Sequence, residues 1–160
     1  MKYSRFEELP VWNDAIGLAV RAYKLTSDRA FLRQRSLRDQ LERAAVSVSN
    51  NIAEGFERGT TQELLTFLYI ARGSAGEVRS MLCLLERLPG FSNLKFEISN
   101  LKSLAEEISR QLRGWANSLQ SGPIKGQRFL TEKSRRLDHA RRDREEMMKE
   151  LRRIQTGTGN

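Results

Sequence analysis

The fold of this chain is decided by residues 60–88, which read TTQELLTFLYIARGSAGEVRSMLCLLERL. Thr60 and Glu63 have the spacing of a capping box, in which each side chain satisfies a free N–H of the first helical turn. Beyond this cap, apolar residues recur every three or four positions, which is the period of one helix face. Pro89-Gly90 then stops the helix. Its predicted apolar seam is Leu64, Phe67, Ala71, Ala75, Val78, Leu82 and Leu85.

Three further stretches have the same helical period. They are residues 9–26, a stretch from Leu32 or Ser36 to Arg58, and residues 93–120, where Asn93 is predicted to be the N-cap. No run of alternating apolar and polar residues with flanking turn signals is present, so the class is all-α. Short links between apolar-seamed helices predict an antiparallel up-down-up-down four-helix bundle.

The helix predicted at residues 60–88 carries more apolar surface than one seam needs. Either a neighbouring subunit covers this surplus, which we favour, or the bundle itself wraps it. Gly73 and Gly76 lie in the middle of the same helix and cost about 1 kcal/mol each relative to alanine. Close approach of another helix would offset that cost. The surplus residues are Leu65, Leu68, Tyr69, Ile70, Met81, Leu84 and Leu88.

Composition limits the class of protein. The 160 residues include 28 Lys+Arg against 20 Asp+Glu, for a net charge of +8. A net positive charge of this size is compatible with binding to a polyanion. The alternative is that the basic residues only face solvent. The lone Cys83 excludes a disulfide-stapled domain. No apolar run approaches the ~18 residues of a membrane span, and residues 1–10 lack the hydrophobic core of a secretory signal. We therefore expect a cytoplasmic protein.

The chain changes character near Ser121, which opens a linker. We predict a four-helix bundle over residues 1–120, a linker over 121–127 and a basic charged extension over 128–160 that is helical or partly disordered. Residues 1–120 hold 17 basic and 14 acidic residues, a net +3, whereas residues 121–160 hold 11 and 6, a net +5. A quarter of the chain thus carries most of the net charge.

The chemistry of catalysis is missing from the sequence. His139 is the only histidine and lies in the extension, while Cys83 is interpreted as a small buried thiol. A zinc site lacks ligands, the paired Glu-x-x-His motifs of di-metal bundles are absent, and no phosphate loop or dinucleotide fingerprint is present. We predict no enzymatic activity, no metal, no cofactor and no small-molecule substrate.

Four segments together resemble a known family. They are residues 6–12 (FEELPVW), 37–48 (LRDQLERAAVSV), 50–56 (NNIAEGF) and 67–77 (FLYIARGSAGE). The pattern over residues 6–120 is similar to that of the four-helix-bundle proteins encoded by intervening sequences within bacterial 23S ribosomal RNA genes.

The resemblance implies an antiparallel four-helix bundle that assembles as a homopentamer, without a known enzymatic activity. A distant relative is the accessory protein of diversity-generating retroelements, a basic pentameric barrel that binds nucleic acid and the element's reverse transcriptase. The implied partner is therefore a structured RNA of ribosomal-insert or retroelement type. This chain departs from the family pattern at Ser49, where proline is usual, and in its extension.

Within the matching segments, Asn51, Glu54 and Glu77 are interpreted as structural. Arg43 is the predicted partner of one of the two carboxylates, because a buried ion pair or amide network would fix the register of the helices. The alternative is that these residues form a ligand-contact cluster.

The basic residues suggest two functions. The first is recognition of a folded RNA by charge and shape, because arginine contacts phosphate with two parallel hydrogen bonds; the alternative is that these residues form solvated outer faces. The second is a protein-interaction scaffold or accessory subunit, for example of a reverse transcriptase, without direct RNA contact. The candidate RNA-binding residues are Arg35, Arg38, Arg58, Arg72 and Arg79 in the bundle and Lys133, Arg135, Arg136, Arg141, Arg142 and Arg144 in the extension.

Overall fold

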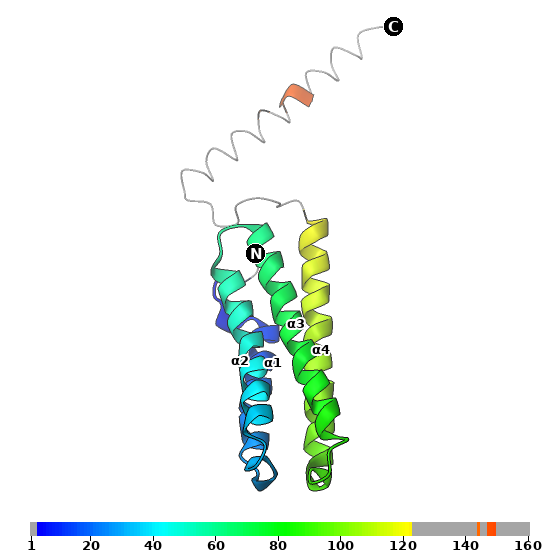
Figure 1. Cartoon of the computed structure of the whole chain (residues 1–160). Helices are drawn as coiled ribbons and strands as arrows, with labels where there is room; N and C mark the ends of the chain where they lie inside the picture. Colours follow the sequence, from blue (N-terminus) through cyan, green and yellow to red (C-terminus); the bar gives the residue numbers. More distant parts are fainter. Residues whose placement is uncertain (1–2, 123–143, 145–146, 150–160) are drawn as a thin grey trace, which may run out of the picture. The chain divides into compact units, whose positions relative to one another are not determined.

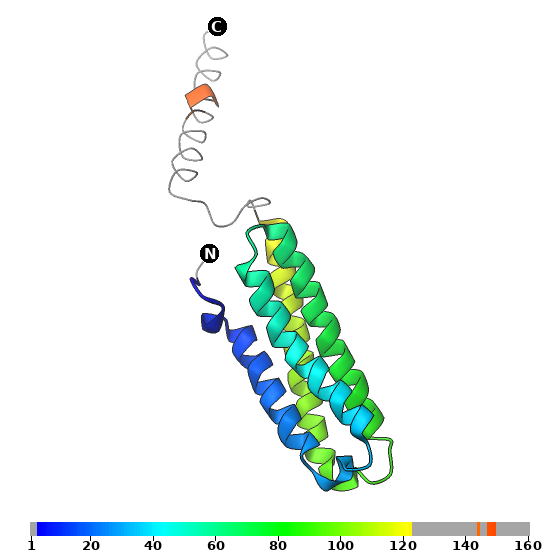
Figure 2. The same cartoon turned by 60° about the vertical axis from the view of Figure 1, so that its left-hand side comes forward.

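Four long helices lie side by side in the computed structural model, which describes residues 3–122, 144 and 147–149 (Figures 1 and 2). No strand occurs among these residues, so the all-α prediction is confirmed. The chain divides into two compact units, residues 1–126 and 127–160. The helices are α1 (Pro10–Thr26), α2 (Arg35–Glu57), α3 (Thr61–Leu85) and α4 (Lys95–Ser121), with 3-10 turns η1 (Phe6–Glu8), η2 (Arg29–Phe31) and η3 (Ser92–Leu94).

The helices of the first unit follow one another around the bundle. Each packs against its sequence neighbours, and α1 also packs against α4, so that α1 and α3 lie diagonally opposite each other. The α1–α2 and α3–α4 connections share one end, at the bottom of Figure 1. We call this the two-loop end. The α2–α3 connection and the last residues of α4 lie at the opposite end, which we call the one-loop end.

The core follows the predicted seams. Six of the seven seam residues of α3 are fully buried, and Phe67 is half-buried. A Cβ added at Gly55 of α2 would lie only 2.7 Å from the Cβ of Phe67, so glycine is what lets α2 and α3 approach there. At the two-loop end the rings of Phe31 and Phe91 meet edge to face, with centroids 4.9 Å apart. This contact ties the two loops together.

The predicted helix ends are partly correct. Thr60 caps α3, because its Oγ1 accepts the backbone N–H of Glu63 at 3.2 Å and donates to the Glu63 carboxylate at 2.8 Å. The prediction of Asn93 as the N-cap of α4 is wrong. Asn93 lies inside η3, and the N-cap is Leu94, whose N–H donates to the Phe91 carbonyl at 3.0 Å. The 3-10 turn leads directly into α4, so no side-chain cap forms.

The bundle itself buries part of the apolar surplus of α3 and leaves part of it exposed. Leu65, Leu68 and Met81 are buried by the bundle itself. Tyr69, Ile70 and Leu84 remain nearly half exposed. The middle of the same helix is open as well, because a Cβ added at Gly73 or Gly76 would meet nothing within 4 Å.

Candidate nucleic-acid interface

Charge is unevenly distributed between the two ends of the helical unit. At the two-loop end, residues 21–35 hold five basic residues and one acidic residue, a net +4, while residues 86–97 are balanced at two of each. At the one-loop end, residues 3–9, 54–63 and 113–122 together hold three basic and five acidic residues, a net −2. The basic character of the unit is therefore concentrated in the α1–α2 connection and its flanks.

Four exposed cations of residues 21–35, on the α1–α2 side of the two-loop end, form no ion pair with any carboxylate that the structure describes, and the exposed Arg87 and Lys95 on the α3–α4 side form none either. The four are Lys24 at the end of α1, Arg29 and Arg33 in the connection, and Arg35 at the start of α2. The connection offers only Asp28 as an acidic neighbour. We call these four residues the free-cation cluster.

A buried network beneath the connection holds this cluster in place. Glu42 of α2 is 9 % exposed and accepts hydrogen bonds from Thr26 Oγ1 at 2.5 Å and from Arg38 Nε at 2.9 Å. Thr26 is the last residue of α1, so the network joins the end of α1 to the first turns of α2. Asp28 caps η2 by accepting the N–H of Ala30 at 2.9 Å.

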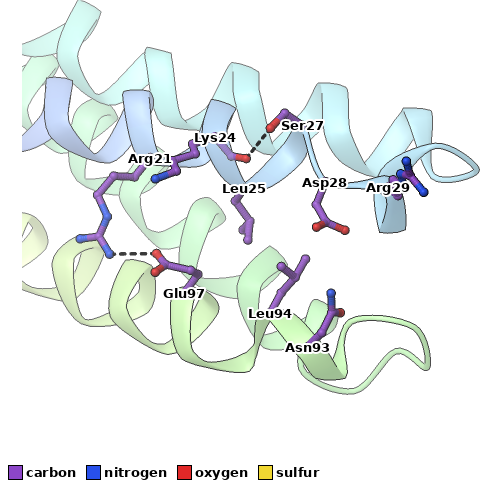
Figure 3. Close-up of a pocket in the computed structure, with 9 residues that line it drawn as sticks. All are labelled: Arg21, Lys24, Leu25, Ser27, Asp28, Arg29, Asn93, Leu94 and Glu97. Atoms are coloured by element: carbon purple, nitrogen blue, oxygen red, sulfur yellow. Dashed lines mark hydrogen bonds and ion pairs between the residues drawn. The ribbon is translucent and has the colours of Figure 1, made fainter.

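Beside the cluster, a cleft of about 800 Å³ lies between the end of α1 and the start of α4 (Figure 3). Leu25 of α1 and Leu94 of η3 point toward each other across it. On one side, Arg21 pairs with Glu97 at 3.5 Å. The remaining lining residues are Lys24, Ser27, Asp28, Arg29 and Asn93.

A second groove, of about 490 Å³ between α3 and α4, differs in how its charges are paired. Arg79 pairs there with Glu106 at 3.6 Å, and Lys102 with Glu86 at 2.7 Å. The hydrogen bond from Lys102 to Glu86 raises the pKa of this lysine above its ordinary value. The half-buried Cys83 also lines this groove. Because each cation already has a carboxylate, the groove has little left to offer a phosphate.

The predicted RNA-binding residues of the bundle do not gather at one place. Arg35 belongs to the free-cation cluster, and Arg38 lies one turn further along α2, held by Glu42. Arg58 lies at the one-loop end, paired with Glu54 at 2.6 Å, with its guanidinium carbon 5.1 Å from the Phe67 ring centroid. Arg79 is paired as described above, and Arg72 is half-buried on α3.

Of the predicted RNA-binding residues in the extension, only Arg144 falls within the described residues; it is helical and exposed. Lys133, Arg135, Arg136, Arg141 and Arg142 lie outside them, as does His139.

The sequence hypothesis missed Lys24, Arg29 and Arg33. The available signal was the segment from Arg29 to Arg38, which contains four arginines and no acidic residue.

The predicted structural motif is only partly assembled. Asn51 donates to the Ser47 carbonyl at 2.7 Å and to its Oγ at 3.0 Å, and Ser47 Oγ lies 2.9 Å from Ser74 Oγ of α3. Asn51 therefore belongs to a polar bridge between α2 and α3.

The two carboxylates of the motif are not brought to Arg43. Glu54 pairs instead with Arg58, which lies one turn along on the same face, and Glu77 and Arg43 are both exposed. Ser49, which replaces the usual proline, is buried and donates to the Val46 carbonyl at 3.1 Å. Helix α2 runs unbroken through it.

Within the part of the chain that the structure describes, no helix has both the length and the apolar character needed to cross a membrane. Nor do three or more His, Cys, Asp or Glu side chains gather there in a group positioned to hold a metal ion.

Residues 7–114 match the family described as 23S rRNA-intervening sequence protein. The chain belongs to this family. The match confirms the family resemblance, and it includes α1 to α3, most of α4 and the whole two-loop end. Residues 115–160 lie outside the match. No curated protein matches this 23S rRNA-intervening sequence protein.

Proposed function

We propose that this 23S rRNA-intervening sequence protein is a non-catalytic RNA-binding protein of the cytoplasm that places its two-loop end on the phosphates of a folded RNA. The free-cation cluster carries the proposal, because its four members are exposed and have no described carboxylate to compete with a phosphate. The family name supports an RNA of ribosomal-insert type, and the retroelement type is the other candidate.

Whether a cation already forms an ion pair with a carboxylate decides how much it can contribute to an RNA-binding surface. A guanidinium that already binds a carboxylate must give up that contact, whereas a free one exchanges only water for phosphate. Arg35 and the neighbouring Arg38 therefore stay in the proposed interface, and Lys24, Arg29 and Arg33 join it. The basic residues of the extension, Arg144 included, are proposed to add contacts to the same RNA.

We also propose that the protein is an up-down-up-down bundle that assembles as a homopentamer. Exposed Tyr69, Ile70 and Leu84 on α3 support self-association, because a surface of this kind is usually covered. The number five rests on the family resemblance. Five copies would carry a formal charge of about +40, five times +8. Light scattering tests the assembly, and a monomer at micromolar concentration would contradict it.

RNA binding is tested by titrating a labelled hairpin RNA at two salt concentrations. We expect Arg29→Gln/Arg33→Gln/Arg35→Gln to weaken binding and to make the slope of log K against log salt shallower by about 3, one unit for each lost phosphate contact. If a control variant of the same charge weakens RNA binding as much as this triple variant does, the free-cation cluster is not the RNA-binding surface. If wild-type binding does not depend on salt, the protein does not bind RNA by charge.

The matched control removes three positive charges far from the two-loop end. It combines Arg5→Gln, Arg110→Gln and Arg113→Gln, and it should change the slope much less. Two of its residues already pair with carboxylates, Arg5 with Glu7 and Arg110 with Glu107.

The second candidate is a protein-interaction scaffold, such as an accessory subunit of a reverse transcriptase, without direct RNA contact. The exposed apolar residues of α3 favour it, because they would equally suit another protein. Docking of that kind depends little on salt, so the same titration separates the two candidates. A protein that fails to bind any hairpin at low salt supports the scaffold.

A further inference from the structure

We propose that the cleft beside the free-cation cluster holds one unpaired nucleotide extruded from an RNA helix, with its base against Leu94 and its edge on Asp28. This inference rests on the proposed RNA binding and specifies what part of the RNA is read. It adds one base contact to a surface that otherwise recognises charge and shape.

The size of the cleft suits a single nucleotide. Its volume of about 800 Å³ falls within the range of about 300–1,000 Å³ that is typical of small-ligand sites. The cleft lies between two helices, where a duplex has no room to enter, whereas one extruded nucleotide does. Unpaired bases in bulges and loops are also the usual targets of sequence-dependent RNA recognition.

The walls of the cleft match the faces of a base. Leu94 is half-buried and presents apolar surface to the cleft, while Leu25 opposite it is only 5 % exposed and contributes little (Figure 3). Arg21, held at 3.5 Å by Glu97, presents a planar guanidinium of the kind that stacks on bases. Among the described residues no aromatic side chain lines the cleft, so apolar contact and the arginine plane provide the stacking surface.

The edge of the base would meet a carboxylate. Asp28 uses Oδ1 to accept the Ala30 N–H, and a carboxylate has further acceptor positions but no donor. The base must therefore bring the donors. Guanine presents two adjacent ones, its N1–H and its 2-amino group, whereas uracil presents a single N3–H. The Asn93 amide, which also lines the cleft, donates and accepts.

The phosphate of the same nucleotide would meet Lys24 and Arg29, which line the cleft and belong to the free-cation cluster. Asp28 is then the residue that distinguishes base recognition from binding by charge alone. A carboxylate in the middle of a phosphate-binding surface weakens purely electrostatic binding, unless it is there to read a base. The competing explanation is that Asp28 serves only to cap η2.

Asp28→Asn separates these explanations, because asparagine caps about as well as aspartate. The probes are three hairpins with the same stem, one fully paired, one with a single bulged guanosine and one with a single bulged uridine. We expect wild-type protein to prefer the bulged guanosine over the paired stem by about tenfold, the value of one hydrogen bond to a charged group. The bulged uridine should fall between the two.

The variant should move two readouts in opposite directions. Asp28→Asn removes a negative charge, so the paired stem should bind as tightly as before or more tightly, while the preference for the bulged guanosine should fall to near unity. Asp39→Asn is the matched control, because Asp39 is exposed on α2 outside the cleft. It should strengthen binding of all three hairpins alike.

The apolar wall is tested separately. Leu94→Ala should reduce the bulge preference, while Leu104→Ala, at another half-buried position of α4, should leave it intact. Thermal melting of each variant confirms that it is folded. Equal wild-type affinity for the three hairpins overturns this inference, as does uniform strengthening by Asp28→Asn. Salt-dependent binding of the paired stem would still uphold the proposed function, and its absence would remove both.

Discussion

The two ends of the same four helices differ in charge and in how that charge is used. The two-loop end has a net charge of +4, and six of its seven cations form no described ion pair, whereas the one-loop end has a net charge of −2 and pairs two of its three cations, Arg5 and Arg58, with carboxylates. Net charge alone would not separate a binding surface from a solvated one. The pairing state of each cation does.

The difference has a local cause. On a helix, a carboxylate three or four residues away lies on the same face as the cation, as in the pairs Arg38–Glu42, Arg58–Glu54 and Arg110–Glu107. The α1–α2 connection breaks that geometry, and it contains one acidic residue whose carboxylate caps η2. The cations of this connection therefore have no carboxylate partner among the residues that the structure describes.

The largest effect is expected from the aromatic contact that joins the two loops. Phe31→Ala and Phe56→Ala each remove an almost fully buried ring, and each should lower the free energy of unfolding by about 3–5 kcal/mol. Only Phe31→Ala should also weaken RNA binding, because Phe56 lies near the one-loop end. Denaturant unfolding and RNA titration of both variants check this. Equal RNA affinity of the two would show that the cluster does not depend on the shape of the connection.

An intermediate effect is expected at Glu42. Glu42→Gln keeps an acceptor for Thr26 but removes the charge that holds Arg38, and should cost about 1.5 kcal/mol of unfolding free energy. The exposed pair at the other end is the control, and Glu54→Gln should cost less than about 1 kcal/mol. Urea unfolding of the two variants gives the comparison. If Glu54→Gln loses more unfolding free energy than Glu42→Gln, the more stabilising polar contacts do not lie at the two-loop end.

The smallest effect is expected from pH at the one-loop end. A hydrogen bond from Arg5 lowers the pKa of Glu7, and the backbone N–H of Ser4 lowers that of Glu8. A carboxyl whose folded pKa is lowered stabilises the fold above its ordinary pKa of about 4.3. That stability is lost as the pH falls through the lowered values. Melting temperatures between pH 7 and pH 3 should fall slightly less for Glu7→Gln/Glu8→Gln than for wild type; identical losses would contradict this.

The sequence predicted the helices well, because periodicity and capping act over a few residues. Thr60 caps α3 as predicted by accepting the Glu63 N–H, although the Glu63 carboxylate accepts the Thr60 hydroxyl and not a backbone N–H, and six of the seven seam residues of α3 are buried. The prediction of Asn93 as the N-cap was wrong because a 3-10 turn leads directly into α4, and the periodicity of the sequence does not reveal that turn. The contact between Phe31 and Phe91 could not be predicted either, because it joins isolated aromatic residues sixty positions apart.

The candidate site was harder to predict than the fold. Arg35 was predicted from its basic surroundings, but a sequence does not show which arginines find a carboxylate in space. Arg79 pairs with Glu106 on another helix. Arg43 was expected beside a carboxylate and is exposed, because Glu54 has Arg58 four residues away. Arg29 and Arg33 lay in a stretch without helical period and so outside the faces considered.

The opposite charges at the two ends also have a kinetic consequence. Helix α3 has 25 residues and so spans about 37 Å, which separates +4 from −2 by most of the length of the helical unit. The unit therefore carries an electric dipole along its long axis. In the field of a polyanion such a dipole turns the molecule before contact, so that collisions begin with the connection between α1 and α2 facing the polyanion.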